Sequence, residues 1–378
     1  MIKICGMFGV RMFEWYMRSL WPLHRLFVRN RLSKRCARCL ISEKQGPLQD
    51  GLCLFCLNDQ AQKIESGVSL NVSDREQAFN DVVAKSNHPE SLYDALVLFS
   101  GGKDSAYLLY RIRKQNPTMR ILALTVDNGF MSPIAWKNIN RIVGVFGVEH
   151  MVYRPASDFY KKLFRFAFIN SGTRGCYEVV DRLGGDALHD IGRNIAARLG
   201  IPILMSGISP EQVERILGLE TFESPSGYER QTRMVSAGFD LKDIFSKEER
   251  ERYWWNGDSW PSERIPRVLF PFYAWGYDED AIRSEMVALG LFKASNVSPL
   301  VTNSILIPLM GVIDVRRNGY SSFEQEFAGL VRSGKADRKR WISIFELLEY
   351  EAHSEMFLKK IIDRGLEKLE LKRSDVGL

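Results

Sequence analysis

One stretch constrains the fold of this 378-residue chain more than any other: an apolar run that passes through two adjacent glycines into an amphipathic segment. It covers residues 96–110 and reads LVLFSGGKDSAYLLY. Residues 96–99 are apolar without alternation, which is typical of a strand buried on both faces of a parallel sheet. The glycines can take backbone angles that a Cβ obstructs, so successive N–H groups can converge where the next helix begins. The stretch predicts a strand, a phosphate-binding turn and a helix.

The side chains of this turn suit a bound phosphate. Lys103 adds a positive charge, Ser105 a hydroxyl, and Asp104 a carboxylate that can orient the turn or approach Mg²⁺. The order of residues is not that of P-loop nucleotide triphosphatases, because the lysine directly follows an adjacent pair of glycines. The sequence from Ser100 to Ser105 resembles instead the S-G-G-x-D-S signature of the PP-loop ATP pyrophosphatase superfamily. The alternative is an ordinary glycine turn between a strand and a helix.

A second segment extends this pattern into a sheet. Residues 120–129 predict a buried strand that ends in a polar turn, and a strand, a helix and a parallel strand form a right-handed crossover unit. Ligands of open parallel sheets bind beyond the carboxyl ends of the strands, where Asp127 and Asn128 fall. We expect these residues near adenosine or Mg²⁺. The alternative is a turn that caps the next helix.

A further strand, within residues 200–207, is followed by a helix that begins at Ser209-Pro210-Glu211. Gly207 and Glu211 are then expected at the same edge of the sheet as the glycine turn. Glu211 either helps to hold Mg²⁺ against ATP or interacts only with the positive end of its own helix. The succession of strands and helices predicts an α/β fold with a parallel sheet.

Four of the six cysteines form two C-x-x-C pairs, and thirteen residues separate the pairs. Two knuckles with this spacing can direct four thiolates tetrahedrally at one Zn²⁺. A redox pair and an iron–sulfur site are the alternatives. Because a closed four-thiolate site leaves no coordination position for a substrate, we expect a structural zinc ribbon. Its predicted ligands are Cys36, Cys39, Cys53 and Cys56.

Two later segments offer candidate substrate contacts. The loop 171–176 carries Arg174, which can bind an acidic group of a substrate bidentately. It also carries Cys176, which is either a sulfur carrier or a small packed residue; the lack of a resolving partner favours packing. The tryptophan-rich segment 253–260 is expected to cover a binding site, either as a platform for a sugar or as an unspecific lid.

The net charge of +6 is unevenly placed, because residues 1–35 hold eight lysines or arginines against Glu14 alone. The rest of the chain carries about −1, which disfavours nucleic acid as a partner. Residues 7–30 predict a basic, aromatic helix that Pro22 kinks or divides. This helix either packs on its own body or contacts a membrane surface or a partner protein. We expect no secretory signal and no transmembrane span, and a cytoplasmic chain, with a peripheral membrane contact as an option.

Together, the cysteine ribbon, the S-G-G-K-D-S turn, the turn 126–129, the loop 206–211 and the segment 331–338 resemble the N-acetyl sugar amidotransferases of surface-polysaccharide biosynthesis, such as lipopolysaccharide O-antigen. The resemblance covers about residues 36–350. It implies that AMP is placed on the oxygen of the acetamido group of a free or nucleotide-linked sugar. Ammonia then displaces AMP to leave an acetamidino group. The PP-loop superfamily also implies an adenine nucleotide alpha-hydrolase-like domain.

The resemblance assigns roles to the candidate residues. The phosphates of ATP are expected on Ser100, Gly101, Gly102, Lys103, Asp104 and Ser105, with Lys103, Asp104 and Ser105 catalytic, and Asp127, Gly207 and Glu211 are expected to contact the nucleotide or Mg²⁺. The implied cofactors are ATP, Mg²⁺ and Zn²⁺. No glutaminase module is visible, and Cys5 is not an N-terminal nucleophile. Ammonia is therefore expected from a separate glutaminase and synthase-like protein pair.

The predicted organisation is a basic aromatic extension (1–35), the zinc ribbon (36–62), a linker (63–92), the ATP pyrophosphatase domain (93–275) and a helical C-terminal region (276–378). Two other function classes stay open. A PP-loop sulfurtransferase acting on tRNA or a small molecule uses the same adenylation but needs a reactive cysteine outside the ribbon. A nucleotide-binding partner protein without catalysis is the other alternative.

Overall fold

The computed structural model describes residues 12–62, 71–86, 90–156, 158–293 and 304–378; Cys5 lies outside them. Its central sheet has five parallel strands in the order β3-β2-β1-β4-β7. Every residue of the three middle strands is buried, which explains their continuous apolar sequences. The predicted α/β fold with a parallel sheet is confirmed. The strands are β1 (Ala95–Leu98), β2 (Ile121–Val126), β3 (Glu149–Tyr153), β4 (Ile203–Met205) and β7 (Arg267–Leu269).

The strand order changes direction at β1, because β2 and β3 are added on one side of this strand and β4 and β7 on the other. This strand pairs with β2 on one side, where Leu98 lies opposite Leu124, and with β4 on the other, where Val97 lies opposite Met205. A parallel sheet opens a crevice beyond the carboxyl ends of the strands at such a switch point. The glycine turn follows β1 directly at this crevice.

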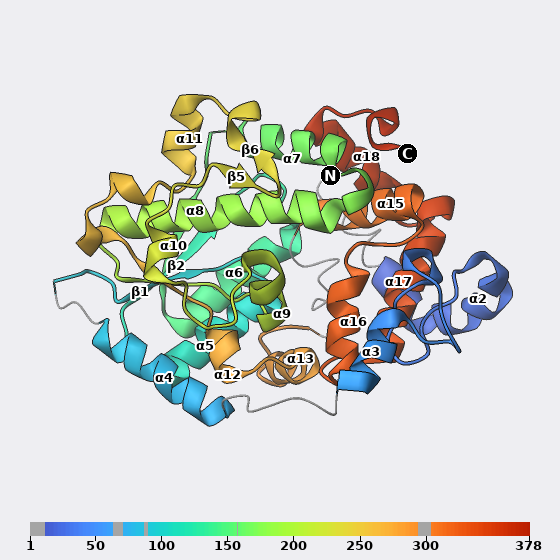
Figure 1. Cartoon of the computed structure of the whole chain (residues 1–378), viewed down its shortest axis with the longest axis horizontal. Helices are drawn as coiled ribbons and strands as arrows, with labels where there is room; N and C mark the ends of the chain where they lie inside the picture. The colour runs from blue at the N-terminus through green and yellow to red at the C-terminus, as the bar shows by residue number, and fades with distance from the viewer. Residues whose placement is uncertain (1–11, 63–70, 87–89, 157, 294–303) are drawn as a thin grey trace.

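Helices cover both faces of the sheet. α5 (Lys103–Gln115) and α6 (Pro133–Phe146) lie on one face, and α8 (Arg182–Leu199) lies on the other (Figure 1). α7 (Phe159–Asn170) packs on α8. Gly192 of α8 allows close packing, because a Cβ there would lie 2.8 Å from a methyl group of Leu98. Because α5 follows β1 directly through the glycine turn, its amino end lies at the crevice.

The segment between β4 and the C-terminal helices is made of short elements. The expectation of an aromatic lid at 253–260 is wrong for its first three aromatic residues, since Tyr253, Trp254 and Trp255 are buried. The Tyr253 ring packs against Phe159 of α7, with the ring centroids 4.3 Å apart, so these rings belong to the core. The elements are α9 (Pro210–Gln212), α10 (Ser226–Glu229), β5 (Val235–Ser236), β6 (Phe239–Asp240), α11 (Lys247–Tyr253) and α12 (Pro271–Trp275).

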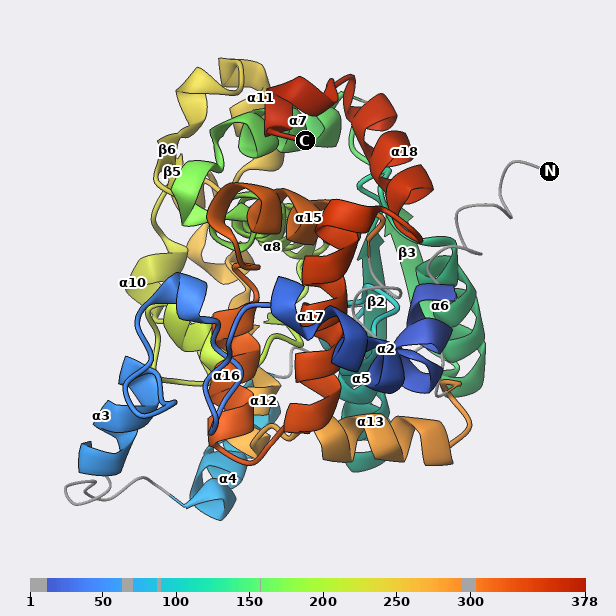
Figure 2. The ribbon, with the colours of Figure 1, turned by 90° about the vertical axis from the view of Figure 1, so that its right-hand side faces the viewer.

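The C-terminal region is helical, as predicted, and stands beside the ribbon and the N-terminal helices (Figure 2). α15 packs against α17 and α18, and α17 also contacts α2. The helices of this region are α13 (Glu279–Ala288), α15 (Leu306–Asn318), α16 (Glu324–Arg332), α17 (Arg338–Ser354) and α18 (Lys359–Leu369). Those before the sheet are α2 (Trp21–Val28), α3 (Leu54–Gln62) and α4 (Val72–Lys85).

Pro22 divides the N-terminal helix, as expected. Residues 12–19 are helical, and α2 begins at Trp21 with the proline in its first turn. Trp21 is fully buried against Tyr350 of α17, and Arg25 donates to Glu346 at 2.7 Å. One side of this segment is therefore packed on the body. Within the described ranges, no helix is both long and apolar enough to cross a bilayer.

The glycine turn gives a first testable prediction. Gly101 has a φ of +76°, and a Cβ there would lie 2.6 Å from the carbonyl oxygen of Ala135 and 2.8 Å from Ile139. We expect Gly101→Ala to lower the free energy of unfolding by about 3 kcal/mol. Gly144→Ala, in open space in α6, is expected to raise it by about 0.5 kcal/mol. Urea denaturation measures both, and equal effects would contradict the assignment of strain to Gly101.

Candidate active site and cysteine cluster

The glycine turn is held in shape by its own side chains. Ser100 Oγ accepts from the Gly102 N–H at 3.3 Å and lies 3.2 Å from Ser105 Oγ. Asn138 of α6 donates to the Gly101 carbonyl at 3.1 Å. Among the described residues, no side chain caps the amino end of α5, where Gly102 is the N-cap. The free N–H groups and the helix dipole make this end suitable for an anion.

A cavity of about 280 Å³ opens beside this turn and the carboxyl ends of β1, β2 and β4. We call it the nucleotide-side cavity. Ser100, Ser105 and Gly207 line it, and α15 also borders it. Gly207 allows the walls to approach, because a Cβ there would lie 3.3 Å from the Cα of Ser105. Gly101 and Gly102 are themselves buried, so the serines and Gly207 form the part of the turn that faces the cavity.

His189 of α8 also lines the nucleotide-side cavity. Its Nε2 lies 2.7 Å from Ser206 Oγ, at the end of β4. Burial and the nearby Arg193 guanidinium lower the pKa of His189 to about 3. The ring is therefore neutral at physiological pH and forms part of a satisfied polar face.

A second cavity, of about 150 Å³, lies on the other side of the same helix end. We call it the aromatic cavity. Lys103 and Asp104 line it at one side, and Phe327 of α16 and Trp341 and Phe345 of α17 line the other. The two cavities share two lining residues, Asp181 and Ile307.

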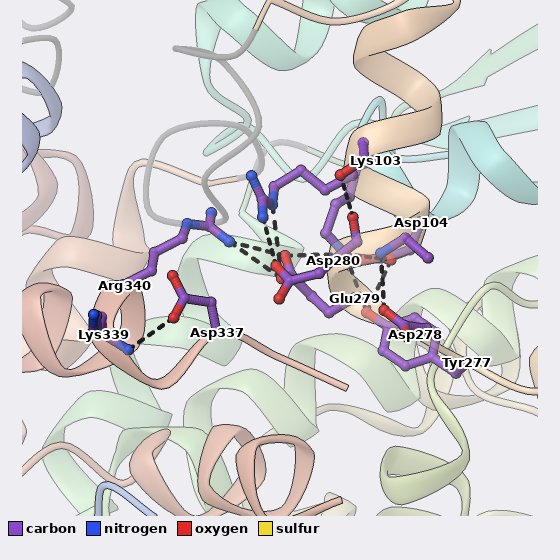
Figure 3. Close-up of polar contacts among 12 residues, drawn as sticks. Lys103, Asp104, Tyr277, Asp278, Glu279, Asp280, Asp337, Lys339 and Arg340 are labelled. Atoms are coloured by element: carbon purple, nitrogen blue, oxygen red, sulfur yellow. Dashed lines mark hydrogen bonds and ion pairs between the residues drawn. The ribbon is translucent and has the colours of Figure 1, made fainter. Parts of the chain in front are cut away.

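Lys103 points toward the aromatic cavity rather than into the glycine turn. Its Nζ lies 2.6 Å from Asp104 Oδ1, 3.1 Å from Tyr277 Oη and 3.8 Å from Glu279 Oε1 (Figure 3). Glu279 is buried and also pairs with Arg340 at 3.2 Å. The sequence did not predict roles for Tyr277 or Glu279, which lie just before and at the start of α13. Lys103 is thus held at the aromatic cavity by a network that spans α5, α13 and α17.

Two carboxyl groups of the aromatic cavity have unusual environments. Asp181 ends a π-helical turn, Tyr177–Asp181, of a kind that is frequent at functional sites. Burial, reinforced by the Glu178 carboxylate, raises the pKa of Asp181 to about 6. Burial likewise raises the pKa of Glu326, on α16, to about 7. Asp181 and Glu326 come from distant parts of the chain, and no local sequence pattern predicts that their carboxyl groups line the same cavity.

The raised pKa of Glu326 predicts how stability depends on pH. The folded state holds its proton more tightly than the unfolded state, so stability is full at low pH and falls as the pH rises toward 7. We expect Glu326→Gln to be about 2 kcal/mol more stable than the wild type at about pH 8 and nearly equal at about pH 4.5. Glu248→Gln, on an exposed position, is the control. A pH-independent difference in urea denaturation would contradict the prediction.

The other predicted acids lie near the sheet edge but have different partners from those expected. Asp127 is buried, accepts from Arg154 Nε at 2.8 Å and lines a neighbouring cavity rather than the nucleotide-side cavity. Glu211 lies 3.5 Å from Lys335 and lines a cavity beside the ribbon. Of the three candidate Mg²⁺ ligands, the partly exposed Asp104 is the one that lies at the amino end of α5.

Arg174 is not among the residues that line the nucleotide-side or the aromatic cavity. Its Nη1 donates to the Ala237 carbonyl at 2.7 Å, and its guanidinium lies over the Phe239 ring. Cys176, in the same loop, is fully buried, and burial raises the pKa of its thiol well above the ordinary value. The packed interpretation of Cys176 fits this environment, whereas a reactive thiolate does not.

The four predicted ligand cysteines converge. Their Sγ atoms all lie within 4.8 Å of one another, and all four residues are buried. The Ile41 N–H donates to Cys39 Sγ at 3.5 Å, and the Cys53 N–H donates to Cys36 Sγ at 3.4 Å. Burial raises the pKa of Cys36, but backbone N–H donors outweigh it and bring the pKa down to about 6. Four convergent sulfurs with N–H donors fit a metal ion such as Zn²⁺.

The ribbon is fixed to the C-terminal helices by buried charges. Arg35 lies 2.9 Å from Glu324 and 3.1 Å from Glu349, and its side chain is 5% exposed. Arg338 donates to the carbonyls of Cys36 and Cys39 at 2.7 and 2.6 Å. Arg338, at the end of the basic segment 331–338, thus contacts the ribbon through two backbone carbonyls. A metal bound to the cluster would hold in place the two backbone carbonyls that accept hydrogen bonds from Arg338.

The comparisons with known proteins give the following. No family model matches the chain, and no curated protein does either. Among solved structures, the U34-tRNA thiolase of Methanococcus maripaludis is 14% identical, with 90% of this chain and 91% of that chain covered and a TM-score of 0.35. NMN synthetase of Francisella tularensis is 13% identical, with 76% and 96% covered and a TM-score of 0.34.

A third similar structure is the NH3-dependent NAD synthetase of Campylobacter jejuni, which is 14% identical, with 79% of this chain and 96% of that chain covered and a TM-score of 0.32. At these values, none of the three likenesses assigns the chain to a family or gives it an activity. The sheet, the glycine turn and the cavities therefore define the class of protein by themselves: an α/β protein with a glycine turn suited to an anion at its switch point and a four-cysteine cluster.

Proposed function

We propose that the chain is an ATP-dependent, AMP-forming amidotransferase of the PP-loop superfamily that converts an N-acetyl sugar into its acetamidino derivative. One observation carries the proposal. The uncapped amino end of α5 lies at the switch point of the sheet, with a cavity on each side of it and a common wall at Asp181. Such a division suits a reaction in which a group passes from one bound molecule to another.

In this proposal, ATP occupies the nucleotide-side cavity with its β,γ-phosphates at the amino end of α5. Ser100 and Ser105 face that cavity, and Lys103, the first residue of α5, lines the aromatic cavity. A lysine there can stabilise charge that develops on the leaving pyrophosphate. Asp104 is placed to hold Mg²⁺, which would neutralise phosphate charge when bound.

The acceptor occupies the aromatic cavity. Phe327 and Trp341 stack in its wall, and flat rings pack well against sugars. Two buried donors there, Ser321 Oγ and Trp341 Nε1, have no hydrogen-bond partner among the described residues. A ligand with hydroxyl or carbonyl oxygens would satisfy both donors. Asp181 and Glu326 make this cavity unfavourable for a diphosphate, so a nucleotide carrier would lie outside it.

The proposed reaction has two steps, the adenylation of the acceptor and the displacement of AMP by ammonia. The acetamido oxygen attacks the α-phosphorus of ATP, the bond to the bridging oxygen breaks, and pyrophosphate leaves. Ammonia then adds to the activated carbon, AMP departs with the former amide oxygen, and the excess protons pass to general bases. A carboxylate such as Asp181, whose pKa is raised to about 6 by burial, can accept one of them at neutral pH.

A PP-loop sulfurtransferase is the second candidate. It would use the same adenylation but would need a thiolate that reaches the activated atom. Cys176 is fully buried and the pKa of its thiol is raised, both of which disfavour this role. We therefore favour ammonia as the nucleophile, supplied by a separate glutaminase and synthase-like pair, in cytoplasmic synthesis of a surface polysaccharide.

Mass spectrometry of the products tests this proposal. The purified chain is incubated with ATP, Mg²⁺, ammonium and a panel of N-acetylated sugars and sugar nucleotides. Exchange of the amide oxygen for NH is expected to lower the product mass by about one unit, with AMP formed in equal amount. A gain of sulfur with a sulfide donor, or no product with any acceptor, would contradict the proposal.

A further inference from the structure

A second feature of the chain has no role in the proposed reaction: the outward side of the N-terminal helical segment. Large apolar side chains project from it, with exposed fractions of 50% for Trp15, 64% for Leu23, 66% for Leu26 and 87% for Phe27. Leu20, 42% exposed, lies between them. Figure 1 shows α2 at the outer edge of the molecule. We call these five residues the apolar face.

The apolar face is not simply the exposed part of a loosely attached helix. The opposite side of the same segment is packed, because Phe13, Met17 and Trp21 are buried at spacings of four residues. Arg25 anchors α2 to Glu346, and Ser33 anchors the following turn to Glu349 at 2.7 Å. One side of the segment is therefore packed and hydrogen-bonded to the body, and the apolar side chains project from the other side.

The exposed charge of the segment that carries the apolar face has one sign. Residues 12–42 contain seven arginines or lysines and a single acid, Glu14, which is buried and lies 3.3 Å from Arg18. Arg29, Arg31 and Lys34 are exposed and make no ion pair with a residue that the structure describes. An apolar face bordered by uncompensated cations complements an anionic lipid surface, where aromatic and leucine side chains enter the interface and cations meet headgroups.

We propose that the apolar face, together with Arg29, Arg31 and Lys34, docks the protein on the surface of a bilayer that contains anionic lipid. α2 lies in the plane of the interface and does not cross it. Phe27 and Leu23 enter the boundary between headgroups and acyl chains. The proposed amidotransferase activity is not needed for this docking, so the two proposals can fail independently.

Sedimentation of the full-length protein with vesicles tests this inference. Vesicles of equal parts phosphatidylcholine and phosphatidylserine are expected to bind the protein, and vesicles of phosphatidylcholine alone to bind it at least about tenfold more weakly. Binding to the mixed vesicles should weaken as salt is added. Equal binding to both vesicles, or none to either, would overturn the proposal.

Matched variants separate the contributions. Leu23→Ser combined with Phe27→Ser is expected to weaken vesicle binding at least about tenfold without changing charge, and Arg29→Gln with Arg31→Gln about as much. Leu92→Ser removes a leucine of similar exposure outside the apolar face and should leave binding unchanged. If the Leu23 and Phe27 changes instead dissociate a dimer in sedimentation equilibrium and leave vesicle binding intact, the face is a contact between copies and the proposal is wrong. Circular dichroism verifies that each variant is folded.

Discussion

Lys103→Ala is expected to lower the rate of AMP formation by about two to three orders of magnitude while leaving the fold intact. The lysine lies at the first position of α5, and its ammonium contacts Asp104 and Tyr277. Its removal takes away the cation beside the aromatic cavity and leaves the Asp104 carboxylate with the hydrogen bond from Tyr277 Oη at 3.0 Å. The loss should appear mainly in kcat, since charge builds on the leaving pyrophosphate in the transition state.

The control for this prediction is Lys114→Ala, on the same helix. Lys114 is exposed near the carboxyl end of α5 and contacts Tyr110. Its loss should change neither kcat nor KM. Both variants are assayed by release of labelled pyrophosphate, with the acceptor that mass spectrometry identifies. A Lys103→Ala enzyme within about threefold of the wild type would remove the lysine from the proposed mechanism.

Cys53→Ser is expected to abolish metal binding by the ribbon. The four sulfurs lie within 4.8 Å of one another, so loss of one ligand breaks a closed tetrahedral set. Metal binding in such knuckles supplies about 10 kcal/mol or more of the free energy that orders them. Plasma mass spectrometry should find about one zinc per wild-type chain and close to none in the variant.

Cys176→Ser is the matched control, because this cysteine is buried outside the cluster and donates to Ser171. It should keep the zinc content of the wild type. Iron in place of zinc in the wild-type protein would contradict the assignment of a zinc ribbon. So would a Cys53→Ser protein that retains its metal.

Much of the fold follows from local patterns in the sequence. Continuous apolar runs predicted β1 and β2, and the glycine pair after β1 predicted where α5 begins. β7 was not predicted, because it has only three residues and follows a segment without periodicity. The tryptophans near residue 254 were misassigned to a lid because composition alone does not distinguish an exposed aromatic loop from rings packed against α7.

The candidate site was predictable only where one segment builds it. The turn from Ser100 to Ser105 forms within six residues. The metal-ligand pattern of the cysteines can likewise be recognised from the spacing within and between their two pairs. Asp127 and Glu211 were placed at the right edge of the sheet, but distant cations, Arg154 and Lys335, determine where their carboxylates point. The aromatic cavity could not be predicted, because tertiary packing brings α16 and α17 to the amino end of α5.

The proposed activity depends on whether the turn after β1 cradles phosphates that leave as pyrophosphate. Phosphorus NMR of a complete reaction, with ATP, Mg²⁺, ammonium and the identified acceptor, measures this directly. We predict that AMP and pyrophosphate accumulate in equal amounts, and that neither forms when the acceptor is omitted. Accumulation of ADP and inorganic phosphate would contradict the proposed function.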